Sequence, residues 1–129
     1  MLPPKLTILN LYTAAICNLN CIYCYIDKSP SLQKIDDILD KSFSSDYYFN
    51  YSKKIFKPEE LQEIHFWGGE PSMGLHRMYA LLPKFIEYYP NLKGFAMSTN
   101  FTIATWFDEF FGFLNVLKQY PHRQFEFRL

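Results

Sequence analysis

The stretch Ile64-His65-Phe66-Trp67-Gly68-Gly69-Glu70-Pro71 decides the fold of this chain. It begins with a short, mostly apolar run and then passes into two glycines, which predicts a buried strand followed by a tight turn. Three other segments carry the same kind of signal, and the last of them alternates apolar and charged residues, as a half-buried strand does. These further expected strands cover residues 5–12, 94–99 and 125–129.

Between the strands, apolar residues recur at helical spacing. The expected helices cover residues 29–43, 76–89 and 105–118. Pro83 lies inside the second helix and is expected to kink or split it. Thr105, with Asp108 three residues later, predicts the cap of the third helix. Residues 44–57 mix aromatic and polar side chains, and we expect them to be irregular. Strands that alternate with helices predict an α/β fold, with a parallel sheet covered by helices.

Composition limits the function classes. The chain has 129 residues, of which 49% are hydrophobic and 20% charged, as expected for one folded domain. Its 13 basic residues balance its 13 acidic ones, and there is no basic run, which argues against a nucleic-acid partner. No stretch approaches the ~18 consecutive apolar residues of a membrane span. We therefore expect a cytoplasmic protein with neither a nucleic-acid nor a membrane partner.

All three cysteines lie close together, as Cys17-x3-Cys21-x2-Cys24. Thiolates are soft ligands that select zinc, copper(I) or iron–sulfur clusters. A closed zinc site needs four ligands, and the nearest histidine, His65, is 41 residues beyond Cys24. Three thiolates on a four-iron cluster leave one iron open for chemistry. The alternatives are three buried free thiols, or a redox pair of Cys21 and Cys24. The cluster is favoured because its spacing uses every cysteine.

Two further motifs follow predicted strands. In Gly68–Pro71, paired glycines let a ligand approach the backbone, and Glu70 can accept hydrogen bonds from an ammonium group. In 97–100, Ser98 and Asn100 can hydrogen-bond a polar ligand. Alternatively, these segments are an ordinary strand-to-helix turn and the opening of a polar loop. Because the carboxyl ends of parallel strands meet at one edge, we expect the three motifs to face one shared site.

The run from Cys17 to Tyr25, followed by Gly68-Gly69-Glu70-Pro71, resembles the radical S-adenosylmethionine (SAM) superfamily. It is especially similar to members that mature peptides and sulfatases, often with a C-terminal SPASM extension. The resemblance implies a partial (βα)6 barrel in which Cys17, Cys21 and Cys24 hold a [4Fe–4S] cluster, while the open iron binds SAM. The residues that it places at the SAM cofactor are Tyr23, Gly68, Gly69, Glu70, Pro71, Ser98 and Asn100.

The reaction implied by the resemblance is reductive cleavage of SAM to methionine and a deoxyadenosyl radical, which abstracts a hydrogen from a substrate. The implied partners are an electron donor, such as flavodoxin or ferredoxin, and a peptide or protein substrate. The cofactors carry this chemistry, and the protein binds and positions them. We assign no general acid, base or nucleophile.

A complete core of this superfamily has six strands, whereas this sequence predicts four. We therefore expect residues 1–129 to be the N-terminal portion of a core that a downstream polypeptide completes, inactive alone, with Phe110, Phe111 and Phe113 partly exposed. One alternative is a compact four-stranded domain whose last strand is covered by residues 44–57. By function, the alternatives are a non-catalytic iron–sulfur module and a plain redox or zinc-binding domain. The histidines carry no assigned role: His65 is expected in the core, and His76 and His122 in solvent.

Overall fold

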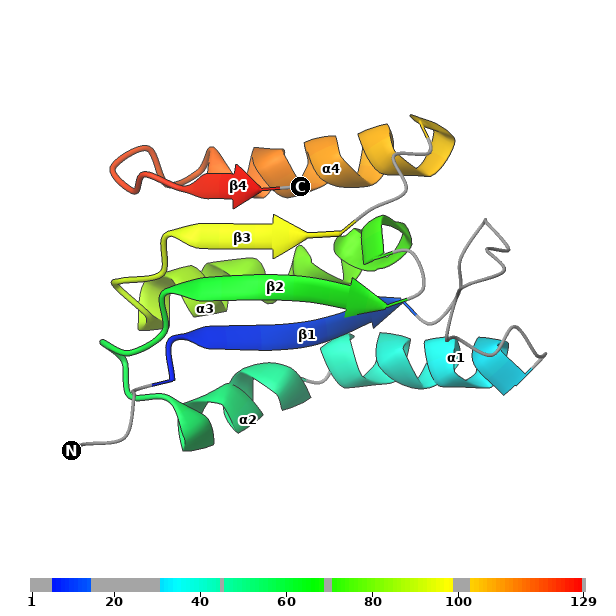
Figure 1. Cartoon of the computed structure of the whole chain (residues 1–129), viewed down its shortest axis with the longest axis horizontal. Helices are drawn as coiled ribbons and strands as arrows, with labels where there is room; N and C mark the ends of the chain where they lie inside the picture. The colour runs from blue at the N-terminus through cyan, green and yellow to red at the C-terminus, as the bar shows by residue number, and fades with distance from the viewer. Residues whose placement is uncertain (1–5, 15–30, 45, 69–70, 99–102, 129) are drawn as a thin grey trace.

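The computed structural model describes residues 6–14, 31–44, 46–68, 71–98 and 103–128, which form strands alternating with helices (Figure 1). The α/β class expected from the sequence is confirmed. In chain order the elements are β1 (Ile8–Ala14), α1 (Ser31–Ser44), α2 (Tyr47–Ile55), β2 (Glu63–Gly68), the 3-10 helix η1 (Pro71–Met78), α3 (Leu82–Tyr88), β3 (Gly94–Met97), α4 (Ile103–Leu117) and β4 (Glu126–Arg128).

The four strands form one parallel sheet in the order β1-β2-β3-β4. Glu63 of β2 pairs with Ile8 of β1 and with Gly94 of β3, which in turn pairs with Glu126 of β4. Each new strand is thus added beside the preceding one, with helices in the crossovers, as along one side of a (βα) barrel. All carboxyl ends of the strands consequently lie at the same edge of the sheet.

One face of the sheet carries the core. Ile64, Phe66 and Phe95 are at most 1% exposed, and Figure 1 shows α3 and α4 behind the strands. The ring of Phe113, from α4, packs edge-on against Phe66 and Phe95, with centroids 5.6 Å and 5.2 Å away. The expectation that Phe113 is partly exposed is therefore wrong, because α4 lays this ring directly on the sheet. Its neighbour Phe111 is 53% exposed, as expected.

The other face, which we call the open face, displays the alternate side chains of each strand. Tyr12 and Trp67 are 38% and 50% exposed there, whereas Leu11 and Phe66, one position earlier, are buried in the core. This alternation follows from the two-residue period of a strand. The open face is formed by Asn10, Tyr12, Glu63, His65, Trp67, Ala96 and Arg128.

The segment 44–57 is not irregular as expected, because it contains α2. Phe49 of this helix packs edge-on against Phe85 of α3, with centroids 5.3 Å apart. Its buried Ser52 hydroxyl is hydrogen-bonded to the Tyr89 hydroxyl, 2.8 Å away. Tertiary packing therefore stabilises a helix that weak local propensity does not indicate. It does not cover the last strand: Phe127 of β4 contacts Phe113 of α4 instead, at 5.3 Å.

Two helix boundaries depend on proline and capping signals. The expected helix over 76–89 is split as Pro83 predicts, since η1 ends at Met78 and Pro83 lies in the first turn of α3, where its missing N–H costs nothing. The cap expected at Thr105 is wrong, because α4 already begins at Ile103 and includes Thr105. Among the helices described, none combines the length and the apolarity that a membrane span requires.

A candidate metal centre at the carboxyl edge of the sheet

Each of the three motifs follows, in the sequence, a strand that ends at the carboxyl edge of the sheet. The cysteine segment lies between Ala14, where β1 ends, and Ser31, where α1 begins. Gly68 ends β2 and pairs with Ala14, so the second motif starts beside the first. Met97 ends β3 one strand farther along. The parallel register therefore brings the ends of these three strands together, and the shared site expected beyond them stays a prediction.

Several of the expected site residues lie outside the described part of the chain. These are Cys17, Cys21, Tyr23, Cys24, Gly69, Glu70 and Asn100. Their assignments stay predictions. Gly68, Pro71 and Ser98 are described, and each has a defined environment.

Gly68 and Pro71 enclose the second motif. Gly68 has a φ of 145°, a conformation that residues with a side chain rarely adopt. Pro71 is buried at the start of η1, and its carbonyl accepts a hydrogen bond of 2.9 Å from the Thr13 hydroxyl. The turn after β2 is thus fastened to the end of β1, beside the cysteine segment.

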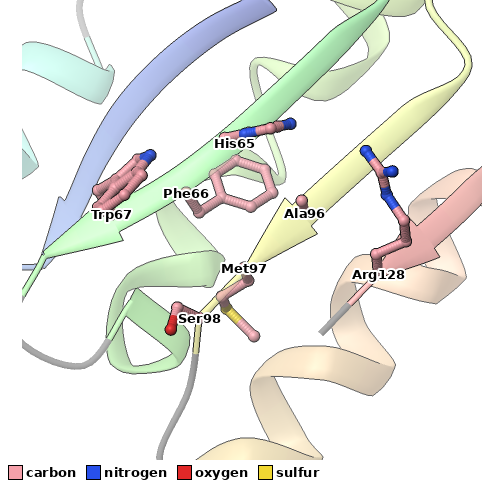
Figure 2. Close-up of a pocket in the computed structure, with 7 residues that line it drawn as sticks. All are labelled: His65, Phe66, Trp67, Ala96, Met97, Ser98 and Arg128. Atoms are coloured by element: carbon pink, nitrogen blue, oxygen red, sulfur yellow. The ribbon is translucent and has the colours of Figure 1, made fainter.

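Ser98 is exposed and lines a cavity of about 300 Å³, shown in Figure 2. The cavity opens between the ends of β2, β3 and β4, partly on the open face. Its lining residues are His65, Phe66, Trp67, Ala96, Met97, Ser98 and Arg128. A small molecule could contact aromatic, thioether and charged groups there, next to the edge that carries the motifs.

Three charged or titratable side chains form a network beside this cavity. His65 Nε2 donates to Glu63 at 2.9 Å, and Arg128 Nη2 lies 2.9 Å from both carboxylate oxygens of Glu63. The hydrogen bond from His65, together with the Arg128 charge, holds the pKa of Glu63 below its usual value, although burial opposes this. The expectation that His65 lies in the core is therefore wrong. Its side chain is 25% exposed, because odd-numbered positions of β2 face the open face.

The other two histidines lie elsewhere. His76 is exposed as expected, but it also binds Glu109 of α4 through both its backbone N–H, at 2.6 Å, and its ring Nδ1, at 2.9 Å. His122 is exposed. Nearby, Tyr79 donates to the Glu109 carbonyl at 2.7 Å, and burial with the neighbouring acidic groups raises its pKa to about 12. These contacts fasten α4 to η1.

A buried arginine near the edge escaped the sequence analysis. Arg77 of η1 binds Asp40 of α1 and the Thr13 carbonyl of β1. Nothing in its sequence neighbourhood distinguishes it from a solvated helix arginine. Only the tertiary structure reveals the role, because its partners are 37 and 64 residues away.

The donor chemistry at this edge fits an iron–sulfur cluster. Within the described ranges, no three His, Cys, Asp or Glu residues are arranged to hold a metal ion, so the described network of Glu63 and His65 is not a metal centre. The thiolate donors of the chain are the three cysteines, which all fall in the sequence between the end of β1 and the start of α1. Three thiolates on one short segment suit iron–sulfur ligation.

Comparison with known proteins gives a family. A family model described as a 4Fe–4S single cluster domain matches residues 8–120, which includes every strand except β4 and all three cysteines. No curated protein and no solved structure shows a significant match. The family match agrees with the thiolate donor set of the chain. The chain therefore belongs to the family of 4Fe–4S single cluster domains, and it is a cluster-binding domain of the radical SAM type.

Proposed function

We propose that Cys17, Cys21 and Cys24 hold a [4Fe–4S] cluster to which SAM binds, and that the chain serves reductive cleavage of SAM for the modification of a peptide or protein. The observation that supports this proposal is that β1, β2 and β3, the strands after which the three motifs follow in the sequence, are parallel and end side by side. Convergence of this kind is how parallel α/β folds build ligand sites.

When bound, the cluster supplies the electron that splits SAM into methionine and a deoxyadenosyl radical. The chain's own residues bind and orient the cluster and SAM. The three thiolates fix the cluster, and the Glu70 carboxylate accepts hydrogen bonds from the SAM ammonium group. Gly68 and Gly69 let the ligand approach the backbone.

The rest of the SAM site is proposed from neighbouring residues. Ser98 and Asn100 offer polar contacts at the end of β3, and Tyr23 adds an aromatic side chain within the ligand segment. The cavity of about 300 Å³ supports this placement, because Ser98 lines it next to the shared edge.

The wider setting is proposed on the resemblance to peptide- and sulfatase-maturing enzymes. It includes a flavodoxin or ferredoxin as electron donor, a cytoplasmic location and a further polypeptide that completes the core. A second candidate function is a module that holds the cluster without cleaving SAM. The matched family description favours it in one respect, since it names a single 4Fe–4S cluster and no reaction.

The first test is anaerobic reconstitution with iron and sulfide. We expect about four irons per chain, and loss of loading when Cys17, Cys21 or Cys24 is replaced by alanine. Stoichiometric zinc without any cluster would refute the proposal.

The second test separates SAM binding from cluster binding. Adding SAM to the reduced protein should change its electron paramagnetic resonance spectrum, and Glu70→Ala should weaken that change without lowering iron content. The matched control is Glu59→Ala, an exposed glutamate in the connection that precedes the amino end of β2. If Glu70→Ala loses as much iron as a cysteine variant, Glu70 is structural and our assignment fails.

The third measurement decides between the two candidate functions. It follows deoxyadenosine by chromatography after dithionite and SAM are added anaerobically. Sustained production above a cysteine-variant blank would establish cleavage by these 129 residues and exclude the non-catalytic module. A SAM-dependent spectrum without deoxyadenosine would favour a chain that needs further strands.

A further inference from the structure

Three elements around the cysteine segment meet at one buried arginine. The Arg77 side chain, on η1, is 5% exposed. Its Nε donates to the Asp40 carboxylate of α1 at 2.7 Å, and its Nη1 donates to the Thr13 carbonyl of β1. A buried guanidinium is costly unless its N–H groups are satisfied, so these contacts hold the three elements in one arrangement.

The backbone of η1 comes unusually close to β1 at the same place. A Cβ atom on Gly74 would lie 2.0 Å from the Thr13 carbonyl oxygen, so only glycine fits there. The Thr13 hydroxyl in turn donates to the Pro71 carbonyl at 2.9 Å. Thr13 thus contacts η1 through both its side-chain hydroxyl and its backbone carbonyl.

An irregularity in the sheet gives Thr13 this special position. Tyr12 pairs with Trp67 and Ala14 pairs with Gly68, so Thr13 is an extra residue in β1. Such a bulge disrupts the ladder locally. The carbonyl of Thr13 instead receives the Arg77 guanidinium.

We propose that Arg77 is a positioning residue for the cluster: it joins the strand that precedes the cysteine segment to the helix that follows it. Thr13 lies four residues before Cys17 in β1, and Asp40 lies sixteen residues after Cys24 in α1. This inference rests on the proposed assignment of the three cysteines as ligands.

Joining β1 to α1 matters because a segment whose flanking elements were not held together would lose more conformational entropy when its thiolates converge on a cluster. The planar fork of arginine can serve an oxygen on each side at once, whereas lysine presents a single point charge. Removal of Arg77 should therefore weaken cluster retention even though every ligand is still present.

The chain contains a matched control at the opposite edge of the sheet. Arg123 is also partly buried, and it donates to the backbone carbonyls of Ile86, Tyr89 and Leu92, just before β3 begins. Replacing Arg123 removes comparable hydrogen bonds to backbone carbonyls, but these lie far along the strands from the cysteine segment. A general loss of stability should appear when either Arg77 or Arg123 is replaced, whereas faster loss of the cluster should appear only when Arg77 is replaced.

The experiment measures iron release from the reconstituted full chain into a chelator, together with urea unfolding of the apo chain. We expect Arg77→Gln to release iron about tenfold faster than wild type, which corresponds to about 1.4 kcal/mol. Arg77→Lys and Asp40→Asn should increase the rate of iron release by less, because each variant keeps some of the hydrogen bonds among Arg77, Asp40 and Thr13. Arg123→Gln should stay within about twofold of wild type at a similar loss of apo stability.

The outcomes separate the two levels of inference. If Arg77→Gln and Arg123→Gln accelerate iron release equally at equal stability, Arg77 is merely structural and the inference is overturned. If Arg77→Gln fails to fold, Asp40→Asn decides instead, since its carboxyl is 58% exposed. A wild-type chain that takes up no cluster overturns the proposed function, and this inference with it.

Discussion

Replacing Gly74 by alanine should break the contact between η1 and β1. The added Cβ would lie 2.0 Å from the Thr13 carbonyl oxygen and 2.5 Å from its carbonyl carbon. Both atoms belong to backbone, which cannot rotate away as a side chain does. Since real Cβ contacts stay above about 3.0 Å, the two segments must separate by about 1 Å.

The cost follows from the hydrogen bonds that cross this contact. The Thr13–Pro71 bond, now 2.9 Å, would lengthen to about 4 Å and fail, at a cost of about 1 kcal/mol. The Arg77 bond to the Thr13 carbonyl is charge-assisted, and losing it would cost about 2 kcal/mol. Alanine restricts the unfolded chain and returns about 0.7 kcal/mol. We expect a net loss of about 2 kcal/mol.

The assay is urea unfolding of the apo chain followed by circular dichroism, in which this loss lowers the midpoint by about 1 M. Gly112→Ala is the control. Its Cβ would lie 2.3 Å from the Tyr79 hydroxyl and 2.6 Å from the ring carbon that carries it, so this side chain must shift and lose its hydrogen bond to Glu109, at a cost of about 1 kcal/mol. A helix interior gains about 1 kcal/mol from alanine, which offsets that cost. This variant should stay within about 1 kcal/mol of wild type. A Gly74→Ala midpoint equal to that of wild type would show that η1 yields without cost, and our reasoning would be wrong.

Three further predictions concern single side chains. Because His65 and Arg128 lower the pKa of Glu63, the charge of Glu63 stabilises the fold above about pH 4.5, and this stabilisation is lost as the pH falls through the lowered pKa. The difference in melting temperature between wild type and Glu63→Gln should therefore shrink in acid. A difference that stays constant with pH would contradict this. Tyr79, with a pKa of about 12, should stay protonated until well above pH 10 in the ultraviolet difference titration between wild type and Tyr79→Phe, which isolates it among the ten tyrosines. A difference curve with a midpoint near pH 10 would refute its burial beside acidic groups. Phe113→Ala should cost about 3–5 kcal/mol in denaturant unfolding, because the ring is fully buried; a loss below about 1.5 kcal/mol would show that the site collapses around the gap.

The sequence predicted the strands well because their signals are local. The apolar run before Gly68 and the alternation around Phe127 each identify a strand in the sheet, with boundaries off by one residue at each end. The helix α2 was missed because its stability comes from contacts such as Phe49 on Phe85, which join segments 36 residues apart. The expectation that Phe113 is partly exposed was wrong for the same reason, since the burial of its ring depends on which face of α4 meets the sheet.

The candidate site divides in the same way. The ends of β1, β2 and β3 lie at one edge, as a parallel topology requires, but most residues of the motifs that follow them lie outside the described part of the chain, so the shared site stays a prediction. The position of His65 on the open face could have been read from the parity of β2, in which Ile64 and Phe66 are buried. Arg77 could not have been found, because its partners depend on the tertiary approach of η1 to β1 and α1.

The pairing of β1 with β2 has a consequence for biosynthesis. Ile8 cannot pair until Glu63 has been synthesised, and Glu63 follows Cys24 by 39 residues. At about 5–20 residues per second, the cysteines are synthesised roughly 2–8 s before the β1–β2 ladder can form. During this interval the contacts of Arg77 with Thr13 and Asp40 are also absent, because Arg77 follows Glu63 in the chain. For the proposed cluster, this strand arrangement therefore favours iron delivery after translation rather than during it.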